Sequence, residues 1–103
     1  MIKLSKRLRA IVNFCDKNKI IADIGTDHGF VPNFLYEEDI NRKIIATDIS
    51  LNSLNKAIEF SELRGNKGKI EHIVCNGLEK IPPVDQIIIA GMGGILILSL
   101  IHI

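Results

Sequence analysis

Polar and glycine residues follow four short apolar runs in this chain of 103 residues, and their types suit them to ligand chemistry. In open α/β sheets, ligands bind outside the carboxyl ends of the strands, where such segments come together. Four of them in one chain predict a single ligand site along one rim of a sheet. The segments are Asp23-Ile24-Gly25-Thr26-Asp27-His28-Gly29, Asp48-Ile49-Ser50, Asn76-Gly77-Leu78 and Ala90-Gly91-Met92-Gly93-Gly94.

The first segment disfavours a phosphate-bearing cofactor. A dinucleotide fingerprint needs glycine at the first, third and sixth positions of GxGxxG, but the residues there are Gly25, Asp27 and Phe30. Asp27 would place a carboxylate where two phosphates should sit. S-adenosylmethionine has no phosphate and carries an ammonium and a sulfonium, so an acidic glycine loop tolerates it. The spacing of Asp23, Gly25, Asp27 and Gly29 keeps the acidic-x-Gly-x-x-x-Gly skeleton of such loops.

Two later segments supply acceptors for the same cofactor. Asp48 lies 23 residues beyond Gly25, at the place for a carboxylate that accepts both ribose hydroxyls. Asn76 can accept from an adenine amino group through its amide oxygen. The alternatives are a helix-capping Asp48 and a turn formed by Asn76 and Gly77. The predicted cofactor contacts are Asp23, Gly25, Thr26, Asp27, Gly29, Asp48, Ile49, Asn76, Gly77, Ala90 and Gly91.

Helices and strands must alternate to position these segments. Apolar residues at helical spacing predict an amphipathic helix over 4–15. Pro32 is expected to open a second helix, which ends near Glu38 and Asp39. Ser50 is expected to cap a third, which turns Leu51, Leu54, Ala57 and Ile58 inward and stops at Gly65. Short β-branched runs predict parallel strands at 19–24, 43–48, 69–74 and 84–90. The pattern indicates an α/β doubly wound sheet.

The count of elements suggests a fragment. A helix should begin after the fourth strand, and a sheet left at that stage would have an uncovered face and strand edge. The last six residues, Leu98 to Ile103, look like the translation of a transposon end used as a sequencing adapter. We therefore expect residues 1–97 to be an incomplete domain and 98–103 a non-native tail. The alternative for 98–103 is a natural apolar helix.

Composition favours a cytoplasmic protein. No apolar stretch approaches a membrane span, the start lacks a secretory signal, and Cys15 and Cys75 are expected to be reduced thiols. Neither cysteine has metal-ligand spacing, so no metal is predicted. The first 19 residues hold six basic side chains against one acidic, so this segment either meets phosphates or forms a solvated helix face.

Four sequence segments, in order, resemble the bacterial tRNA (adenine 22-N1)-methyltransferase family. The segments are LSKRLRAIVNF, ADIGTDHGFVP, ATDIS and NGLEKIPPVDQIIIAGMGG. The intervals between them also match, so the resemblance runs from about Leu4 to Ile97. The resemblance implies a Rossmann-like class I S-adenosylmethionine-dependent methyltransferase fold, truncated after the fourth strand. It also implies a further helical domain in the complete protein and tRNA as substrate. The chain departs from the family at Asn52-Ser53, where Gly-Pro is usual, and at Asn76, where Asp is usual.

The resemblance also suggests roles for individual residues. Asp27 is the candidate for stabilising positive charge on the methylated base, and His28 for orienting the base. The alternative for His28 is a capping or packing role. Predicted substrate contacts are Arg7, Arg9, Met92, Gly93 and Gly94. Two other functions stay open, namely a methyltransferase for a small molecule or protein, and a non-catalytic remnant.

Overall fold

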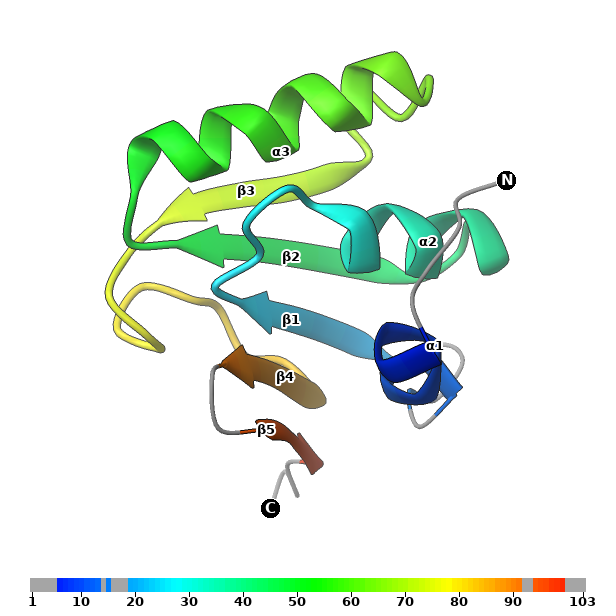
Figure 1. The fold of residues 1–103 in the computed structure, drawn as a ribbon, viewed down its shortest axis with the longest axis vertical. Helices are drawn as coiled ribbons and strands as arrows, with labels where there is room; N and C mark the ends of the chain where they lie inside the picture. The colour runs from blue at the N-terminus through cyan, green and yellow to red at the C-terminus, as the bar shows by residue number, and fades with distance from the viewer. Residues whose placement is uncertain (1–5, 14, 16–18, 92–93, 100–103) are drawn as a thin grey trace.

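The computed structural model describes residues 6–13, 15, 19–91 and 94–99, and these form one twisted sheet with three helices (Figure 1). The described elements alternate between helix and strand up to the third strand, as the sequence predicts. In chain order they are α1 (Lys6–Asn13), β1 (Ile20–Ile24), α2 (Phe30–Glu38), β2 (Lys43–Asp48), α3 (Leu51–Leu63), β3 (Ile70–Val74), β4 (Gln86–Gly91) and β5 (Gly94–Ser99).

The sheet has the strand order β3-β2-β1-β4-β5, with the first four strands parallel. Their arrowheads point to the same side in Figure 1, so the segments that follow them share one rim. The order reverses direction between β1 and β4, because β2 and β3 build outward on one side of β1 and β4 on the other. Such a reversal is where open α/β sheets bind their ligands.

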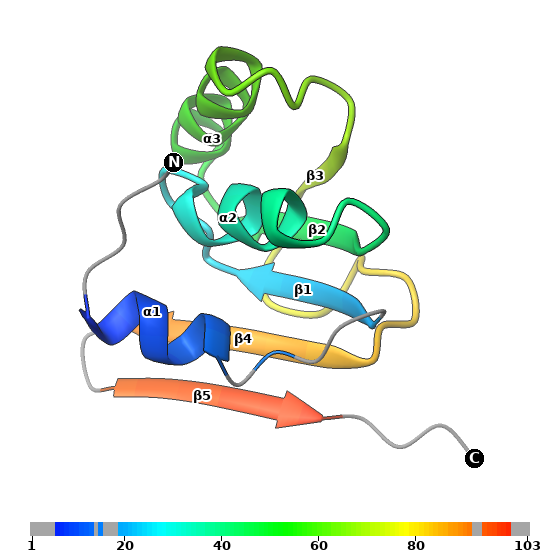
Figure 2. The same ribbon diagram turned by 90° about the vertical axis from the view of Figure 1, so that its right-hand side faces the viewer.

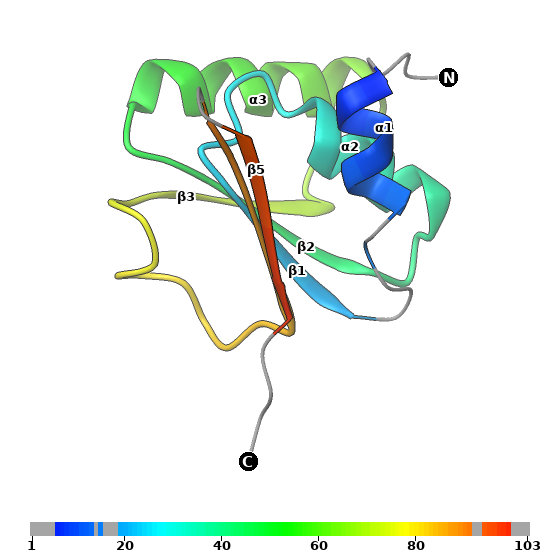
Figure 3. The same ribbon diagram turned by 60° about the horizontal axis from the view of Figure 1, so that its bottom comes forward.

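The three helices cover one face of the sheet, and the connection from β3 to β4 crosses the other (Figures 2 and 3). Side chains alternate between these faces along each strand. Ile21 and Ile44 join the core beneath the helices, whereas Ala22 and Ile45 join the core on the opposite face. Apolar residues on both faces explain why β1 and β2 read as continuous apolar runs.

The helix starts agree with the sequence in part. Ser50 caps α3 as predicted, since its hydroxyl accepts from the Ser53 amide at 3.3 Å. α2 begins at Phe30 instead of Pro32, because Gly29 adopts a φ of 77° and its carbonyl accepts from the Asn33 amide. Pro32 then lies in the first turn, where its missing N–H costs no intrahelical bond.

One predicted core residue of α3 is wrong. Leu54 and Ala57 are buried as expected, but Leu51 is 59% exposed. Leu51 is the first residue of α3, directly after the rim where the strands end, so less of the sheet lies beneath it. Cys15 and Cys75 are both buried, as expected of thiols in or near the core.

The segment after β4 differs from the prediction of a helix. It forms β5, antiparallel to β4, with register from Gln86↔Ser99 to Gly91↔Gly94. The physical reason is that a short apolar run fits a strand as well as a helix, and the edge of β4 offers it backbone hydrogen-bonding groups. β5 includes Leu98 and Ser99, so the structure has no break after residue 97. Residues 100–103 lie outside the described part.

Candidate cofactor site

The β1–α2 loop folds over the end of β2. Two consecutive amides of this loop, from Gly25 and Thr26, donate to the Thr47 carbonyl at 2.9 and 2.8 Å. Gly25 has a φ of 74°, and a Cβ built there would meet no atom within 4 Å. The rim is therefore open at Gly25, and the positive φ favours glycine there.

Asp48 joins two segments of the rim through its carboxylate. One oxygen accepts from the Asp27 amide at 3.1 Å, and the other accepts from the Ser50 amide at 2.9 Å. Asp27 itself has a φ of 55°, which is uncommon for a residue with a side chain. Asp48 thus has a structural role as an acceptor for local amides, but it does not cap α3. Each carboxylate oxygen keeps a lone pair for a further donor.

Asp23 is buried beneath this loop. It is 4% exposed, and its carboxylate accepts from the Thr26 hydroxyl at 2.9 Å. Burial raises the pKa of Asp23 to about 7, the Thr26 hydrogen bond lowers it, and the nearby Asp48 charge raises it further. Asp23 therefore takes up or releases a proton near neutral pH. Thr26 is only 7% exposed, and its side-chain hydroxyl is used in the hydrogen bond to Asp23. A contact of Thr26 with a ligand would therefore come from its backbone.

The turn after β3 completes the described wall of the site. Asn76 and Gly77 form the predicted turn, with a φ of 62° at Gly77 and the Glu79 amide donating to the Asn76 carbonyl. The Cys75 amide donates to the Asp48 carbonyl at 3.1 Å, which holds this turn beside β2. Between the turn and the loop lies a cavity of about 180 Å³, lined by Ile24, Gly25, Thr47, Asp48, Ile49, Cys75, Asn76 and Gly77.

Gly29 is needed for a close approach of the loop to α3. A Cβ there would lie 2.9 Å from the Ala57 Cβ, closer than real side chains come. The Gly29 carbonyl also accepts from the side-chain amide of Asn33, whose Nδ2 lies 2.8 Å away. Asn33 is fully buried and donates to the Ser61 hydroxyl as well, so the loop is tied to both helices. Gly29 therefore acts in packing, below the rim.

The predicted catalytic pair lies at the outer end of the loop. Asp27 and His28 are both exposed, with 3.9 Å between the Asp27 carboxylate and the His28 Nε2. The His28 ring stacks on Phe30 with centroids 5.5 Å apart. The packing alternative for His28 is thus real, and its side chain is still 49% exposed.

The predicted substrate residues are described only in part. Arg9 places its guanidinium 5.7 Å from the centre of the Phe34 ring, in a cation–π contact. Arg7 lies in α1 and Gly94 starts β5, opposite Gly91, while Met92 and Gly93 lie outside the described residues. Ala90 and Gly91 end β4 directly after Ile89, which pairs with Ile24, so their backbone reaches the same rim.

Sequence reasoning missed two features of the site. Thr47 lies in β2 and Cys75 directly follows β3, and neither residue gives a sign in the sequence that it lines the cavity. Phe30 and Phe60 meet although 30 residues separate them, and no local signal pairs such distant rings. Within the described residues, no helix is long and apolar enough to cross a membrane, and no group of three or more possible ligands could hold a metal ion.

The fold and its rim define a class of protein. Residues 4–103 match the family model of the methyltransferase domain, and the chain belongs to that family. The sheet order, the glycine loop and the acidic residue at the end of β2 are features of this Rossmann-like fold.

Individual proteins similar to this chain are more specific than the family model. The chain is 33% identical over 103 residues to the tRNA (adenine(22)-N(1))-methyltransferase of Bacillus subtilis, covering 98% of this chain and 43% of that protein. The structure of M. capricolum TrmK in complex with S-adenosyl-homocysteine is 35% identical, with a TM-score of 0.78 over 85% of this chain and 41% of that one. A Streptococcus pneumoniae protein, Sp1610, in complex with S-adenosyl-L-methionine is 32% identical, with a TM-score of 0.79 over 87% of this chain and 44% of that one. The chain spans less than half the length of each.

Proposed function

We propose that the protein to which this chain belongs transfers a methyl group from S-adenosylmethionine to N1 of an adenine in tRNA. The observation that carries the proposal is the cavity beside Asp48, at the ends of three adjacent parallel strands and next to an acidic glycine loop. The names and bound ligands of the similar proteins support the cofactor and the substrate.

The residues of the cavity fit the adenosine part of this cofactor. Asp48 keeps acceptor capacity for ribose hydroxyls, and the amide oxygen of Asn76 can accept from the adenine amino group. Ile49 is 70% exposed and offers an apolar surface to a flat ring. A volume of about 180 Å³ is smaller than that of a complete ligand site, so this cavity accommodates only part of the cofactor.

Charge at the rim suits a cation. Asp27 and Asp48 lie at the open glycine loop, with Asp23 buried beneath it, and the negative field of their ionised carboxylates attracts the ammonium and sulfonium groups. The same field repels a diphosphate. The Gly25 position leaves the loop backbone free of side-chain bulk on its open side.

The chemistry needs positioning more than proton transfer. When bound, S-adenosylmethionine supplies an electrophilic methyl carbon, which forms a bond to adenine N1 while its bond to sulfur breaks and the positive charge passes to the base. Asp27 is exposed at the loop and would stabilise that charge on the base. His28 would orient the base, which must leave its stack in a folded tRNA to reach the rim. Arg7 and Arg9 would contact phosphates.

We further propose that the chain is the N-terminal part of a longer cytoplasmic protein. Residues 1–97 would be an incomplete methyltransferase domain and 98–103 a non-native tail, although the β5 pairing extends to Ser99. In the similar proteins, more than half of the length lies outside the matched region. The complete protein would need no metal, because the methyl transfer requires no Lewis acid.

The first experiment measures transfer of a labelled methyl group to bulk tRNA by the complete gene product. We expect tRNA to be labelled and the label to map to an N1-methyladenine. Label in protein or in small molecules, with none in tRNA, would show that the substrate is wrong. The 103-residue chain alone is expected to bind S-adenosylhomocysteine weakly or undetectably and to give no turnover. Robust methylation by the short chain would contradict its proposed incompleteness.

A matched pair of substitutions tests the cofactor site itself. Asp48→Asn removes one charged acceptor, and we expect the affinity of the complete protein for S-adenosylhomocysteine to fall about tenfold. Asp39→Asn is the control, because Asp39 also accepts from an amide two residues later, that of Asn41 at 3.0 Å, but follows α2. Calorimetry should separate the two variants. Equal affinities of the two variants for S-adenosylhomocysteine would show that Asp48 does not bind the cofactor.

A further inference from the structure

Three aromatic rings are in contact one after another, from His28 at the rim through Phe30 to Phe60 on α3. The His28 ring lies nearly parallel to the Phe30 ring, with 5.5 Å between centroids and 22° between planes. The edge of one phenyl ring meets the other between Phe30 and Phe60, with centroids 4.9 Å apart and an angle of 70°. Both arrangements are favourable geometries for aromatic pairs.

Packing between helices explains the contact between Phe30 and Phe60, whereas packing on Phe30 explains only one face of the His28 ring. Phe30 starts α2 and Phe60 lies in α3, so their contact joins two helices. His28 adds a third ring at the solvent end, where its side chain remains 49% exposed although Phe30 covers one face. Phe30 is itself 39% exposed. The outer face of the His28 ring is thus free to continue the stack.

We propose that the outer face of His28 is a stacking platform for an unpaired nucleobase of the RNA substrate, held in place by Phe30 and Phe60. This inference rests on the proposed function and adds the part of the site that receives the RNA. Stacking on aromatic rings is the usual means by which proteins hold single-stranded bases, and every base offers a face of the right kind. The platform lies one residue from Asp27, the acceptor proposed for the charged base.

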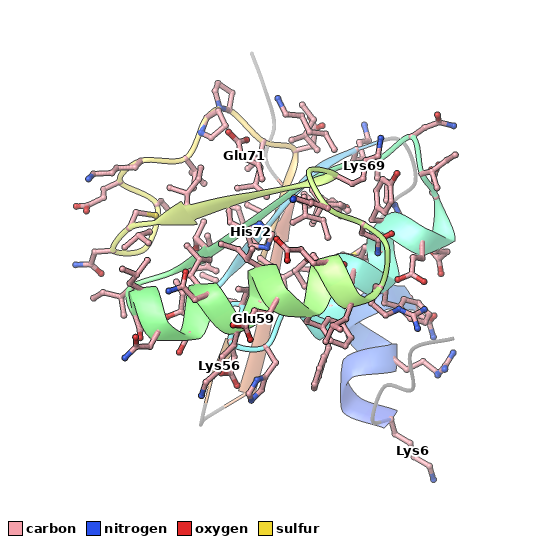
Figure 4. All side chains as sticks on the ribbon, turned by 90° about the horizontal axis from the view of Figure 1, so that it is seen from above. Lys6, Lys56, Glu59, Lys69, Glu71 and His72 are labelled. Carbon is pink, nitrogen blue, oxygen red and sulfur yellow. The ribbon has the colours of Figure 1, made fainter. Side chains whose placement is uncertain are left out.

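The surroundings of the stack suit a nucleotide. Lys56 lies one helical turn before Phe60, and residues four apart share a helix face. Lys56 is exposed, and Figure 4 shows its side chain extending from α3 into solvent. It can therefore meet the phosphate of a nucleotide whose base lies on His28. A cation beside an exposed ring is the combination that single-strand binding sites use.

Two substitutions of His28 separate stacking from other roles of the residue. His28→Ala removes the ring, and His28→Phe keeps an aromatic face without the ring nitrogens. We expect His28→Ala to weaken binding of a short labelled oligoadenylate by the complete protein about tenfold, and His28→Phe to bind within about twofold of the wild type. Fluorescence anisotropy at fixed salt measures both. His28 is exposed, so the fold should tolerate either change.

An abasic strand of equal length is the control for charge. It keeps the phosphates and lacks the bases, so wild type and both variants should bind it equally. The proposal is overturned if the wild type binds the two strands alike, or if His28→Ala binds oligoadenylate as well as His28→Phe does. Loss of oligoadenylate binding in both variants would also overturn it, because it would place the effect in the ring nitrogens.

Failure of this inference can be told from failure of the proposed function. If the complete protein methylates tRNA and the His28→Ala and His28→Phe variants have the same KM for tRNA, only the platform is wrong. If the complete protein stacks bases as expected but methylates no tRNA, the platform stands and the proposed reaction is wrong.

Discussion

The two halves of the sheet differ in how their carboxyl ends are held. At the ends of β1, β2 and β3, backbone amides and the Asp48 carboxylate bind the loops to one another, and α2 and α3 pack on β2 and β3. At the end of β4, the described contact is the antiparallel pairing with β5, where Gly91 lies opposite Gly94. The first half therefore holds the candidate cofactor site in a fixed arrangement. The second half supplies backbone to the same rim, and β4 is held there by its pairing with β1 and β5.

This difference teaches that stability and binding can be separated within one loop. Residues that tie the first half together from below should affect unfolding, whereas residues on its open side should affect ligand affinity. Three groups of substitutions test that division, and the expected effects decrease from the first to the last.

Gly29 and Gly25 provide the sharpest contrast, because both have a φ near 75° and only one is crowded. Gly29→Ala places a Cβ 2.9 Å from that of Ala57, so we expect it to cost about 3 kcal/mol through strain and overpacking. Gly25→Ala meets no atom within 4 Å and should cost only about 1 kcal/mol, from the positive φ alone. Urea unfolding of the two variants measures both values.

The outcome that would break the contrast is equal destabilisation by the two substitutions. That result would mean that the positive φ dominates and that the close approach of the loop to α3 relaxes without cost. Calorimetry with S-adenosylhomocysteine on the complete protein should give the opposite ranking, with the larger loss of affinity for Gly25→Ala.

The buried network between α2 and α3 should contribute the next largest effect. Asn33 donates to the Gly29 carbonyl and the Ser61 hydroxyl and accepts from Asn66. Asn33→Ala leaves buried polar groups without partners, so we expect a loss of about 2 kcal/mol. The matched control is Arg64→Ala, which breaks an ion pair with Glu37 that links the same two helices.

Arg64 is partly exposed to solvent, which weakens its ion pair, so its substitution should cost less than that of Asn33. Thermal unfolding of the two variants distinguishes these expectations. A larger loss for Arg64→Ala would place the link between α2 and α3 in the ion pair and not in the buried amides.

The sequence predicts much of this architecture because the strands are short apolar runs with polar ends. The described strands β1 to β4 start and end within two residues of the predicted ranges, and Ser50 caps α3 as expected. The network around Asn33 escaped prediction because an asparagine inside a helix gives no local sign of its distant partners. β5 escaped it because pairing along β4 depends on which edges the folded sheet leaves open.

The site was predicted at the level of strand ends and less well at the level of side chains. The rim position of Asp48 follows from its place after an apolar run, but its bonds to the Asp27 and Ser50 amides depend on loop conformation. Asp23 was predicted as a cofactor contact, and its burial beneath the loop follows from the path of the chain after β1. That prediction remains open, because a buried carboxylate can still act through its field.

The last and smallest predicted effect concerns Asp23, which should affect both the stability of the fold and the affinity for the cofactor. Its pKa is raised to about 7 in the folded chain, from 3.8, chiefly by burial. The folded chain therefore holds a proton that the unfolded chain releases, so this residue lowers stability as pH rises from about 4 to about 7. Asp23→Asn should remove that slope and raise stability by about 1 kcal/mol at pH 8, because the amide carries no charge to bury.

The measurement is the difference in unfolding free energy between wild type and Asp23→Asn across pH 5 to 8, which cancels other titrating groups. His72 is one of them, since burial lowers its pKa and gives a slope of opposite sign. A cationic cofactor should favour ionised Asp23, so its affinity for the complete protein should rise with pH through about 7 in the wild type only. If the variant gains stability and keeps both its affinity and that pH dependence, Asp23 belongs to the packing of the loop and not to the field that receives the cofactor.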